Sequence, residues 1–309
     1  MEPIANKCPQ ELRAALTGPC PSIKTPFKIN GEIDWNGLHC QLDFVIEAGA
    51  KNIILTYGDS LYSLFTDDEI AEFTKVVVEY VDKRVMVVAA TGIWWTGKTA
   101  EFAKYCAELG ADMLMVLPPD WGASTTVETL VTHYRAASEH IPVMVVTNYL
   151  GQRPVAFAFE VIETLVARVP GIVALKDDVG NAFVRKVCTL AYDHWAIIAG
   201  GSKENHMSML PYGVDGNFSL FIMFKPELAW RYWNAIFEGK IKEAAAFIRD
   251  YDMPLFEFIN TVEGGRDAAI HGILEIAGHS KRYRRAPYHS ISDKQFESLQ
   301  AFISERYGS

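Results

Sequence analysis

The sequence predicts an α/β fold, a (β/α)8 TIM barrel with a C-terminal helical extension. Short apolar runs alternate with segments of helical periodicity about eight times, and the runs are apolar at consecutive positions, as in strands buried on both faces. An open doubly wound sheet is the rival fold. It is less well supported because the repeats are evenly spaced and no Gly-x-Gly-x-x-Gly motif follows the first run.

Each expected strand is a short apolar run, and each expected helix lies between two of them. The strands are expected over residues 19–25, 52–56, 85–91, 113–118, 143–148, 172–176, 196–200 and 216–222. The helices are expected over residues 35–48, 67–81, 98–109, 127–140, 156–169, 182–192 and 204–210. Thr66 followed by Glu69 forms a capping box, and Gly49 and Gly110 lie where two helices are expected to end.

After the last expected strand the pattern becomes purely helical. Helices are expected over residues 226–237, 240–259, 266–277 and 293–307, with a kink at Pro254 because proline cannot donate a helical hydrogen bond. We therefore divide the chain into a barrel with its N-terminal lead-in, residues 1–225, and a helical extension packed on the barrel, residues 226–309.

Composition limits the classes of partner. The net charge of -9 argues against nucleic acid and anionic membrane surfaces, because both repel an acidic protein. The five cysteines are odd in number, widely spaced and without a Cys-x-x-Cys pair, which is typical of reduced thiols. The first residues lack the apolar stretch of a signal peptide, and no later run is long enough to span a bilayer. We expect a soluble, cytoplasmic protein.

Reactive side chains of such barrels stand where the strands end. These positions are Thr56 to Ser60, Thr91, Pro118 to Trp121, Thr147 to Tyr149, Lys176 to Asp178, Gly200 to Lys203, and Ser219. The histidines show no metal-ligand spacing and no Gly-x-Ser-x-Gly motif is present, so we expect no metal, no cofactor and no serine triad. The amides of Gly200 and Gly201 are suited to a phosphate group, although a tight turn explains both glycines equally well.

Lys176 is the candidate nucleophile. It ends an apolar run that begins at Ile172, and it precedes Asp177 and Asp178. A buried site favours the neutral amine, which is the form that attacks a carbonyl group to give a Schiff base. The alternative is a structural lysine that pairs with one of the two aspartates, and this segment alone leaves both interpretations open.

Several segments give the chain a resemblance to a known family along nearly its whole length. They are Thr25-Pro26-Phe27 with Gly31, Ile33 and Asp34; Gly110-Ala111-Asp112; Gly171 to Asp177; Gly213, Gly216 and Ser219; and Arg285-Ala286-Pro287. With these segments the chain resembles the dihydrodipicolinate synthase / N-acetylneuraminate lyase family. The resemblance implies a Schiff-base lyase that acts on pyruvate or a related 2-oxo acid, with Lys176 as nucleophile, in a homo-oligomer of two or four subunits.

The chain departs from the family pattern at two places. Where the family has Gly-Thr-Thr-Gly-Glu, this chain has Thr56, then Tyr57 in place of the second threonine, then Gly58 and Asp59. At the end of the fifth strand the family has tyrosine before asparagine, whereas here Thr147 precedes Asn148. Tyr149 takes the place of that tyrosine if the register slips by two residues. Proton transfer is therefore assigned to Tyr149, Thr147 or Tyr57, with Thr56 assisting.

The remaining expected substrate contacts come from the other strand ends. They are Tyr57, Gly58, Asp59, Gly201, Phe218 and Arg153, of which Arg153 is either a ligand for a second carboxylate or a surface charge. We expect an aldolase or dehydratase, with a 2-oxo-3-deoxy sugar acid as one substrate class. The alternatives are a 2-oxo-acid-binding protein with little catalysis and a phosphate-binding barrel enzyme.

Overall fold

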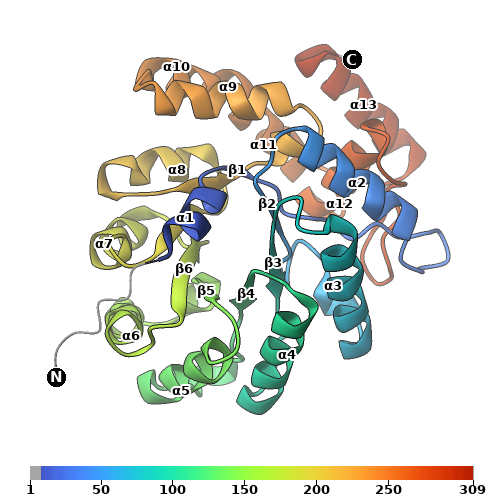
Figure 1. The fold of residues 1–309 in the computed structure, drawn as a ribbon. Helices are drawn as coiled ribbons and strands as arrows, with labels where there is room; N and C mark the ends of the chain where they lie inside the picture. Colours follow the sequence, from blue (N-terminus) through green and yellow to red (C-terminus); the bar gives the residue numbers. More distant parts are fainter. Residues whose placement is uncertain (1–7, 309) are drawn as a thin grey trace.

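A computed structural model describes residues 8–308 and contains an eight-stranded parallel barrel (Figure 1). The strands are β1 (Gly18–Cys20), β2 (Asn52–Ile54), β3 (Met86–Ala90), β4 (Met113–Val116), β5 (Val143–Val146), β6 (Ile172–Asp177), β7 (Ala196–Ala199) and β8 (Gly216–Phe218). They pair in the order β1-β8-β7-β6-β5-β4-β3-β2, and a parallel bridge between Ser22 and Ile54 joins the two ends. The predicted (β/α)8 barrel is confirmed. The expectation that the first residues form no signal peptide concerns in part residues 1–7, which lie outside the described residues.

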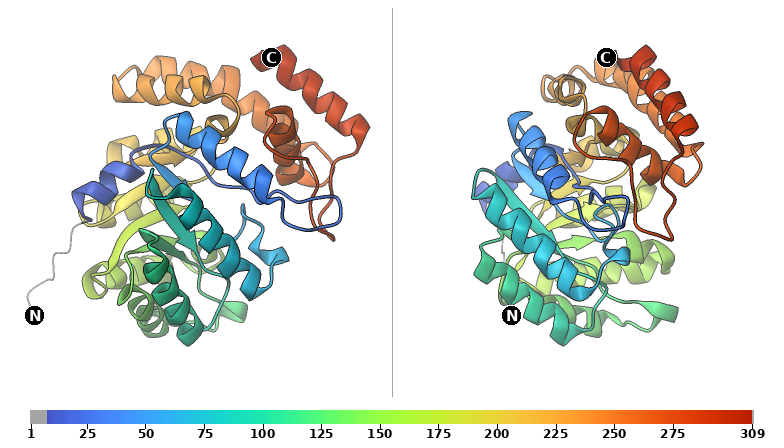
Figure 2. Two further views of the ribbon diagram at one scale, coloured as in Figure 1. Left: turned by 45° about the vertical axis from the view of Figure 1, so that its right-hand side comes forward. Right: turned by 90° about the vertical axis from the view of Figure 1, so that its right-hand side faces the viewer.

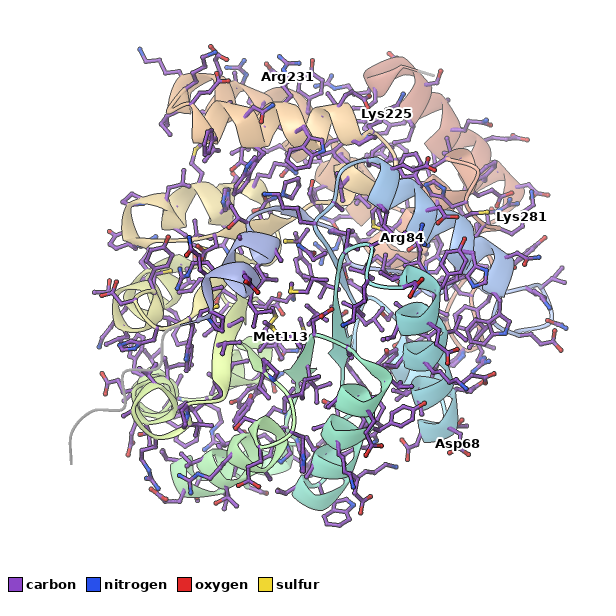
Figure 3. The ribbon with its side chains drawn as sticks, in the orientation of Figure 1. Asp68, Arg84, Met113, Lys225, Arg231 and Lys281 are labelled. Atoms are coloured by element: carbon purple, nitrogen blue, oxygen red, sulfur yellow. The ribbon has the colours of Figure 1, made fainter. Side chains whose placement is uncertain are left out.

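Helices alternate with the strands and surround them. They are α2 (Trp35–Glu47), α3 (Asp67–Val81), α4 (Thr96–Leu109), α5 (Val127–Ser138), α6 (Val155–Arg168), α7 (Asn181–Ala191) and α8 (Lys203–Met209). The capping box of Thr66 and Glu69 begins α3, and Gly110 ends α4 in the left-handed conformation that glycine adopts most readily. Met113 at the start of β4 is fully buried, and Figure 3 shows it near the middle of the barrel.

The short helix α1 (Gln10–Leu16) was not predicted. Its Arg13 donates hydrogen bonds to the carboxylate of Asp215 and to the carbonyl groups of Tyr192 and Trp195. Asp215 and Trp195 directly precede β8 and β7, so α1 lies at the amino ends of these strands. The predicted reactive positions are at the opposite, carboxyl ends.

Seven of the eight expected strands are too long at their carboxyl ends, whereas β6 extends one residue beyond the expected 172–176, to Asp177. β1 stops before Pro21 and β4 stops before Pro118, because proline has no N–H group to donate to a neighbouring strand. β5 and β8 are followed by short 3₁₀ helices, Asn148–Gln152 and Leu220–Met223. Apolar residues beyond each strand therefore belong to loops at the mouth of the barrel.

The C-terminal helices gather on one side of the barrel (Figure 2). They are α9 (Pro226–Phe237), α10 (Ile241–Phe247), α11 (Met253–Asn260), α12 (Gly265–Ile276) and α13 (Asp293–Tyr307), and we call them together the C-terminal extension. A turn of π-helix, Ile248–Asp252, separates α10 from α11 just before Pro254, where the kink was expected. Gly272 of α12 leaves room for Leu299 of α13, which an added Cβ would meet at 2.6 Å.

Candidate active site

A cavity of about 590 Å³ opens at the carboxyl ends of the strands. This volume lies within the range of roughly 300 to 1,000 Å³ that is common for small-molecule sites. Loops of the barrel form one part of the lining, and residues of α11, α12 and the segment 284–288 form the other. Two parts of the chain that are far apart in the sequence therefore share the site.

Lys176 lines this cavity at the end of β6. Its Nζ lies 2.6 Å from Oδ2 of Asp178 and 4.7 Å from the centre of the Phe218 ring, and its side chain is 9% exposed. Asp178 and Phe218 also line the cavity. Of the two aspartates that follow the lysine, Asp178 is thus the ion-pair partner.

Asp177 is buried and holds the loop after β6 in place. Its carboxylate accepts hydrogen bonds from the backbone N–H groups of Val179 and Gly180 and from the side chains of Thr147 and Asn205. Burial raises the pKa of this carboxyl above its ordinary value, and these hydrogen bonds lower it only in part. Asp177 is therefore a structural residue of the site.

Thr147 does not line the cavity, although the sequence made it a candidate for proton transfer. Its hydroxyl donates to Oδ1 of Asp177 at 3.0 Å and accepts from the backbone N–H of Asp178 at 2.9 Å. These two bonds fix the start of the loop that carries Asp178. The structure thus gives Thr147 a positioning role.

Tyr149 is also absent from the cavity lining, and its phenol accepts a hydrogen bond from the hydroxyl of Tyr134 at 3.3 Å. Burial raises the pKa of Tyr149 well above the ordinary value. Tyr57, in contrast, lines the cavity, as does Tyr288, whose hydroxyl lies 3.0 Å from that of Ser63. Burial raises the pKa of Tyr57 as well. Of the three candidates for proton transfer, Tyr57 is the one that faces the site.

The loop after β2 brings the remaining predicted residues together. The hydroxyl of Thr56 accepts from the backbone N–H of Asp59 at 2.9 Å, which closes a tight turn around Tyr57 and Gly58. Asp59 accepts a hydrogen bond of 2.5 Å from the hydroxyl of Ser22. Thr56, Tyr57, Gly58 and Asp59 all line the cavity.

Lys24 is a cavity residue that the sequence reasoning missed. Its side chain is 5% exposed, and its Nζ lies 2.6 Å from Asp59 and 3.8 Å from Asp267 of α12. Gln41 bonds to both the N–H and the carbonyl of Lys24 and so fixes its backbone. Burial raises the pKa of Asp59, but the charges of Lys24 and Lys176 outweigh that effect and hold it well below the ordinary value. A lysine inside an apolar run, directly before Thr25, was the signal available in the sequence.

Helix α12 and the segment between α12 and α13 supply further charges that the sequence did not assign to the site. Arg284, 4% exposed, pairs with Asp267 at 2.6 Å, and both residues line the cavity together with Arg266. Ser219 at the end of β8 also lines it, and its buried hydroxyl has no hydrogen-bond partner within residues 8–308. This hydroxyl is available to a ligand.

The segment after β7 contains three further predicted positions: Gly200, Gly201 and Lys203. Gly201 lines the cavity in a left-handed conformation. The neighbouring Gly200 already donates its N–H to the carbonyl of Asp177, and the buried Lys203 pairs with Asp252 at 2.8 Å. Few donors of this loop therefore remain for a phosphate group.

Arg153 does not line the cavity. Its guanidinium group pairs with Asp120 at 2.6 Å, with side-chain exposures of 10% and 4%, and it lies over the ring of Phe157. The charge that was expected to bind a second carboxylate is therefore occupied by an internal partner.

Other kinds of site find little support in the part of the chain that the structure describes. Residues 8–308 hold no group of three or more His, Cys, Asp or Glu side chains placed to bind a metal ion. All five cysteines are free thiols. None of the helices in the same range combines the length and the apolar character needed to cross a membrane.

Comparisons with known proteins agree with the fold. The sequence profile of the "Dihydrodipicolinate synthetase family" matches residues 15–306. A protein of Streptomyces avermitilis, "Probable 5-dehydro-4-deoxyglucarate dehydratase 2", is 26% identical over 91% of this chain and 84% of its own length. The 4-hydroxy-tetrahydrodipicolinate synthase of Syntrophus aciditrophicus is 27% identical over 93% of this chain and 97% of its own.

Solved structures share the same barrel. Dihydrodipicolinate synthase from Oceanobacillus iheyensis superposes with a TM-score of 0.83 at 21% identity and covers 97% of this chain and 99% of its own. N-acetylneuraminate lyase from Mycoplasma synoviae gives a TM-score of 0.80 at 17% identity and covers 96% and 99% of the two chains. At these identities the likeness concerns the fold.

Proposed function

Because this chain belongs to the dihydrodipicolinate synthetase family, we propose that it is a lyase in which Lys176 forms a Schiff base with a 2-oxo acid. The observation that carries the proposal is the setting of this amine. Lys176 is buried in the cavity at the mouth of the barrel, over the Phe218 ring and next to a carboxylate, Asp178. The proteins that this chain resembles include a dehydratase and a synthase, in agreement with an enzyme of this class.

The reaction begins when Asp178 takes a proton from the lysine. The neutral amine of Lys176 then adds to the carbonyl carbon, and the resulting hydroxyl group leaves as water after it receives a proton. The iminium ion withdraws electrons from the neighbouring carbon atom. That withdrawal allows a carbon-carbon bond to be made or broken there, or water to be eliminated, so both aldolase and dehydratase chemistry fit the site.

The loop after β2 provides the other groups that the reaction needs. The phenol of Tyr57 carries protons to and from the reacting carbon and oxygen atoms, with Thr56 beside it. The backbone N–H groups near Tyr57 and Gly58 hold the substrate carboxylate, since amides at a tight turn bind anions. Phe218 and Gly201 shape the wall of the cavity around the iminium ion.

One observation favours a second candidate function, a 2-oxo-acid-binding protein with little catalysis. At the end of β5 a threonine, Thr147, stands where the resemblance places a tyrosine, and Tyr149 is turned toward Tyr134. A protein without an effective proton carrier forms the Schiff base but turns over slowly. Turnover numbers on a set of 2-oxo acids separate the two functions.

Reductive trapping tests the proposed function. Sodium borohydride should reduce the Schiff base formed with pyruvate or another 2-oxo acid, and peptide mass spectrometry should find the added mass on Lys176. Lys176→Met should abolish both labelling and lyase activity. Labelling at Lys24, which shares the cavity, or at Lys203, or no labelling with any 2-oxo acid, contradicts the mechanism.

We also propose that the protein is a cytoplasmic homo-oligomer of two or four subunits. Five free cysteines support a reducing compartment, and the family relationship supports assembly. Light scattering after size-exclusion chromatography measures the mass of the particle directly. A monomer of 34.6 kDa at micromolar concentration contradicts the proposal of assembly.

A further inference from the structure

The charges that line the cavity do not balance. Four cationic side chains line it, and three of them pair with aspartates that also line it: Lys24 with Asp59, Lys176 with Asp178, and Arg284 with Asp267. The fourth is Arg266. Among residues 8–308 it has no ion-pair partner. One positive charge of the cavity is therefore left without an internal counter-charge.

Arg266 is exposed and stands in the first turn of α12. Its guanidinium carbon lies 5.7 Å from the centre of the Phe256 ring, and Phe256 lines the cavity too. A contact of this kind with a ring face uses none of the N–H donors, and the guanidinium group of Arg266 donates no hydrogen bond within residues 8–308. A guanidinium group with free donors matches a carboxylate, which can accept two parallel hydrogen bonds from it.

Ion pairs connect the loops of the barrel to the helix that carries Arg266. Lys24 lies 2.6 Å from Asp59, which belongs to the loop after β2. Lys24 in turn lies 3.8 Å from Asp267, the residue that follows Arg266 in α12. Arg266 therefore belongs to the part of the lining that the C-terminal extension contributes, whereas Lys176 belongs to the part that the barrel contributes.

We propose that Arg266 binds a second carboxylate at the far end of the substrate, so that the preferred 2-oxo acids are dicarboxylates. This inference rests on the proposed Schiff-base function and specifies its substrate class. The first carboxylate lies beside the iminium ion, and the second reaches the cation of the lining that has no aspartate partner among residues 8–308. A cavity of about 590 Å³ has the volume for a small dicarboxylate. Arg153, which the sequence left open as a ligand for a second carboxylate or a surface charge, is already neutralised by Asp120.

The test compares two acids that have the same carbon chain and differ in the distal carboxylate: 2-oxohexanedioate and 2-oxohexanoate. The concentration for half-maximal borohydride labelling of Lys176 should be roughly tenfold lower for the dicarboxylate, as expected for one charge-assisted contact at a partly exposed site. Arg266→Gln should remove this difference, and Arg266→Lys should retain part of it. Labelling by pyruvate, which has no second carboxylate, should not change in either variant.

A matched control is available on the outside of the molecule. Arg231 of α9, labelled in Figure 3, is likewise exposed and lies 5.1 Å from the centre of an aromatic ring, that of Tyr251. Arg231→Gln should keep the preference of the unmodified protein.

The outcomes separate this inference from the proposed function. Equal labelling by the two six-carbon acids in the unmodified protein overturns the role of Arg266 while the lysine mechanism stands. So does an equal loss of labelling by all acids, pyruvate included, in Arg266→Gln. If no 2-oxo acid labels Lys176, both the mechanism and the substrate class are overturned together.

Discussion

Lys24 and Asp59 form an ion pair inside the cavity, with 2.6 Å between Nζ and Oδ1, and the two partners differ in exposure. The Lys24 side chain is 5% exposed and that of Asp59 is 40% exposed. Removing one partner leaves the other charge without its main counter-charge, and the cost depends on how much water reaches the remaining group.

We predict that Asp59→Asn is more destabilising than Lys24→Met. The first change leaves a buried ammonium with only Asp267, at 3.8 Å, and should lower the free energy of unfolding by about 2 to 4 kcal/mol. The second leaves a carboxylate that water reaches, and should cost about 1 kcal/mol. Urea unfolding of both single variants and the double variant gives the coupling energy. Additive effects of the two changes contradict this prediction.

Tyr57→Phe should slow the chemical step, whereas Tyr149→Phe should not. Of these two phenols, that of Tyr57 lines the cavity and that of Tyr149 faces Tyr134. Loss of general acid-base transfer lowers a rate by roughly 10²-fold or more. Single-turnover rates on a substrate identified by trapping measure the step itself. The opposite ranking assigns the relay to Tyr149, and unchanged rates in both variants leave a water molecule as the carrier.

Thr147→Val should impair Schiff-base formation although Thr147 lies outside the cavity lining. Valine keeps the shape but loses both hydrogen bonds that hold Asp177 and the N–H of Asp178. Asp178 is then less well placed to take the lysine proton, and the pH dependence of labelling at Lys176 should shift. Thr147→Ser keeps the hydroxyl and should restore the profile of the unmodified protein. A profile unchanged in Thr147→Val shows that the threonine does not position Asp178.

The stability of the fold should fall on acidification between about pH 6.5 and pH 4. Burial lowers the pKa of His133 and His271 to about 4, and burial with the charge of Lys203 lowers that of His206 to about 3. In the unfolded chain a histidine has a pKa near 6.5, so in this window the unfolded state binds more protons than the folded state. The stabilisation is fully present above pH 6.5 and is lost as the pH falls toward the folded values.

His271→Leu provides the check on this pH effect. Neither ring nitrogen of His271 has a hydrogen-bond partner within residues 8–308, so leucine leaves no new unpaired group. The free energy of unfolding from urea curves at pH 7 and pH 4.5 should differ less in this variant, by on the order of 1 to 2 kcal/mol. An identical difference in the variant and the unmodified protein contradicts the assignment to this histidine.

The barrel and the position of Lys176 at its mouth could be predicted because each depends on a local pattern. Lys176 ends a run of buried residues, and that run alone places its side chain at the mouth. Lys24 was missed because the expected strand over residues 19–25 is too long. That strand includes Lys24, whereas β1 ends at Cys20 and Lys24 belongs to the loop that lines the cavity.

The contributions of Arg266 and Arg153 could not be predicted from local patterns. Arg266 enters the site because the extension packs against the mouth of the barrel, and Arg153 leaves it because Asp120 lies beside it in space, 33 residues earlier in the chain. Such pairings depend on tertiary packing. The residue types were visible in the sequence, but their partners were not.

Because the cavity lining is divided between the barrel and the C-terminal extension, it is sensitive to the order of synthesis and to proteolysis. Synthesis proceeds from the N-terminus, so the strand that carries the lysine is complete long before the last part of the wall, Tyr288, has been added. A nascent chain, or a chain that a protease has cleaved after β8, contains Lys176 but lacks the part of the cavity wall that the C-terminal extension provides. An enclosed site around Lys176 therefore requires an intact C-terminal extension.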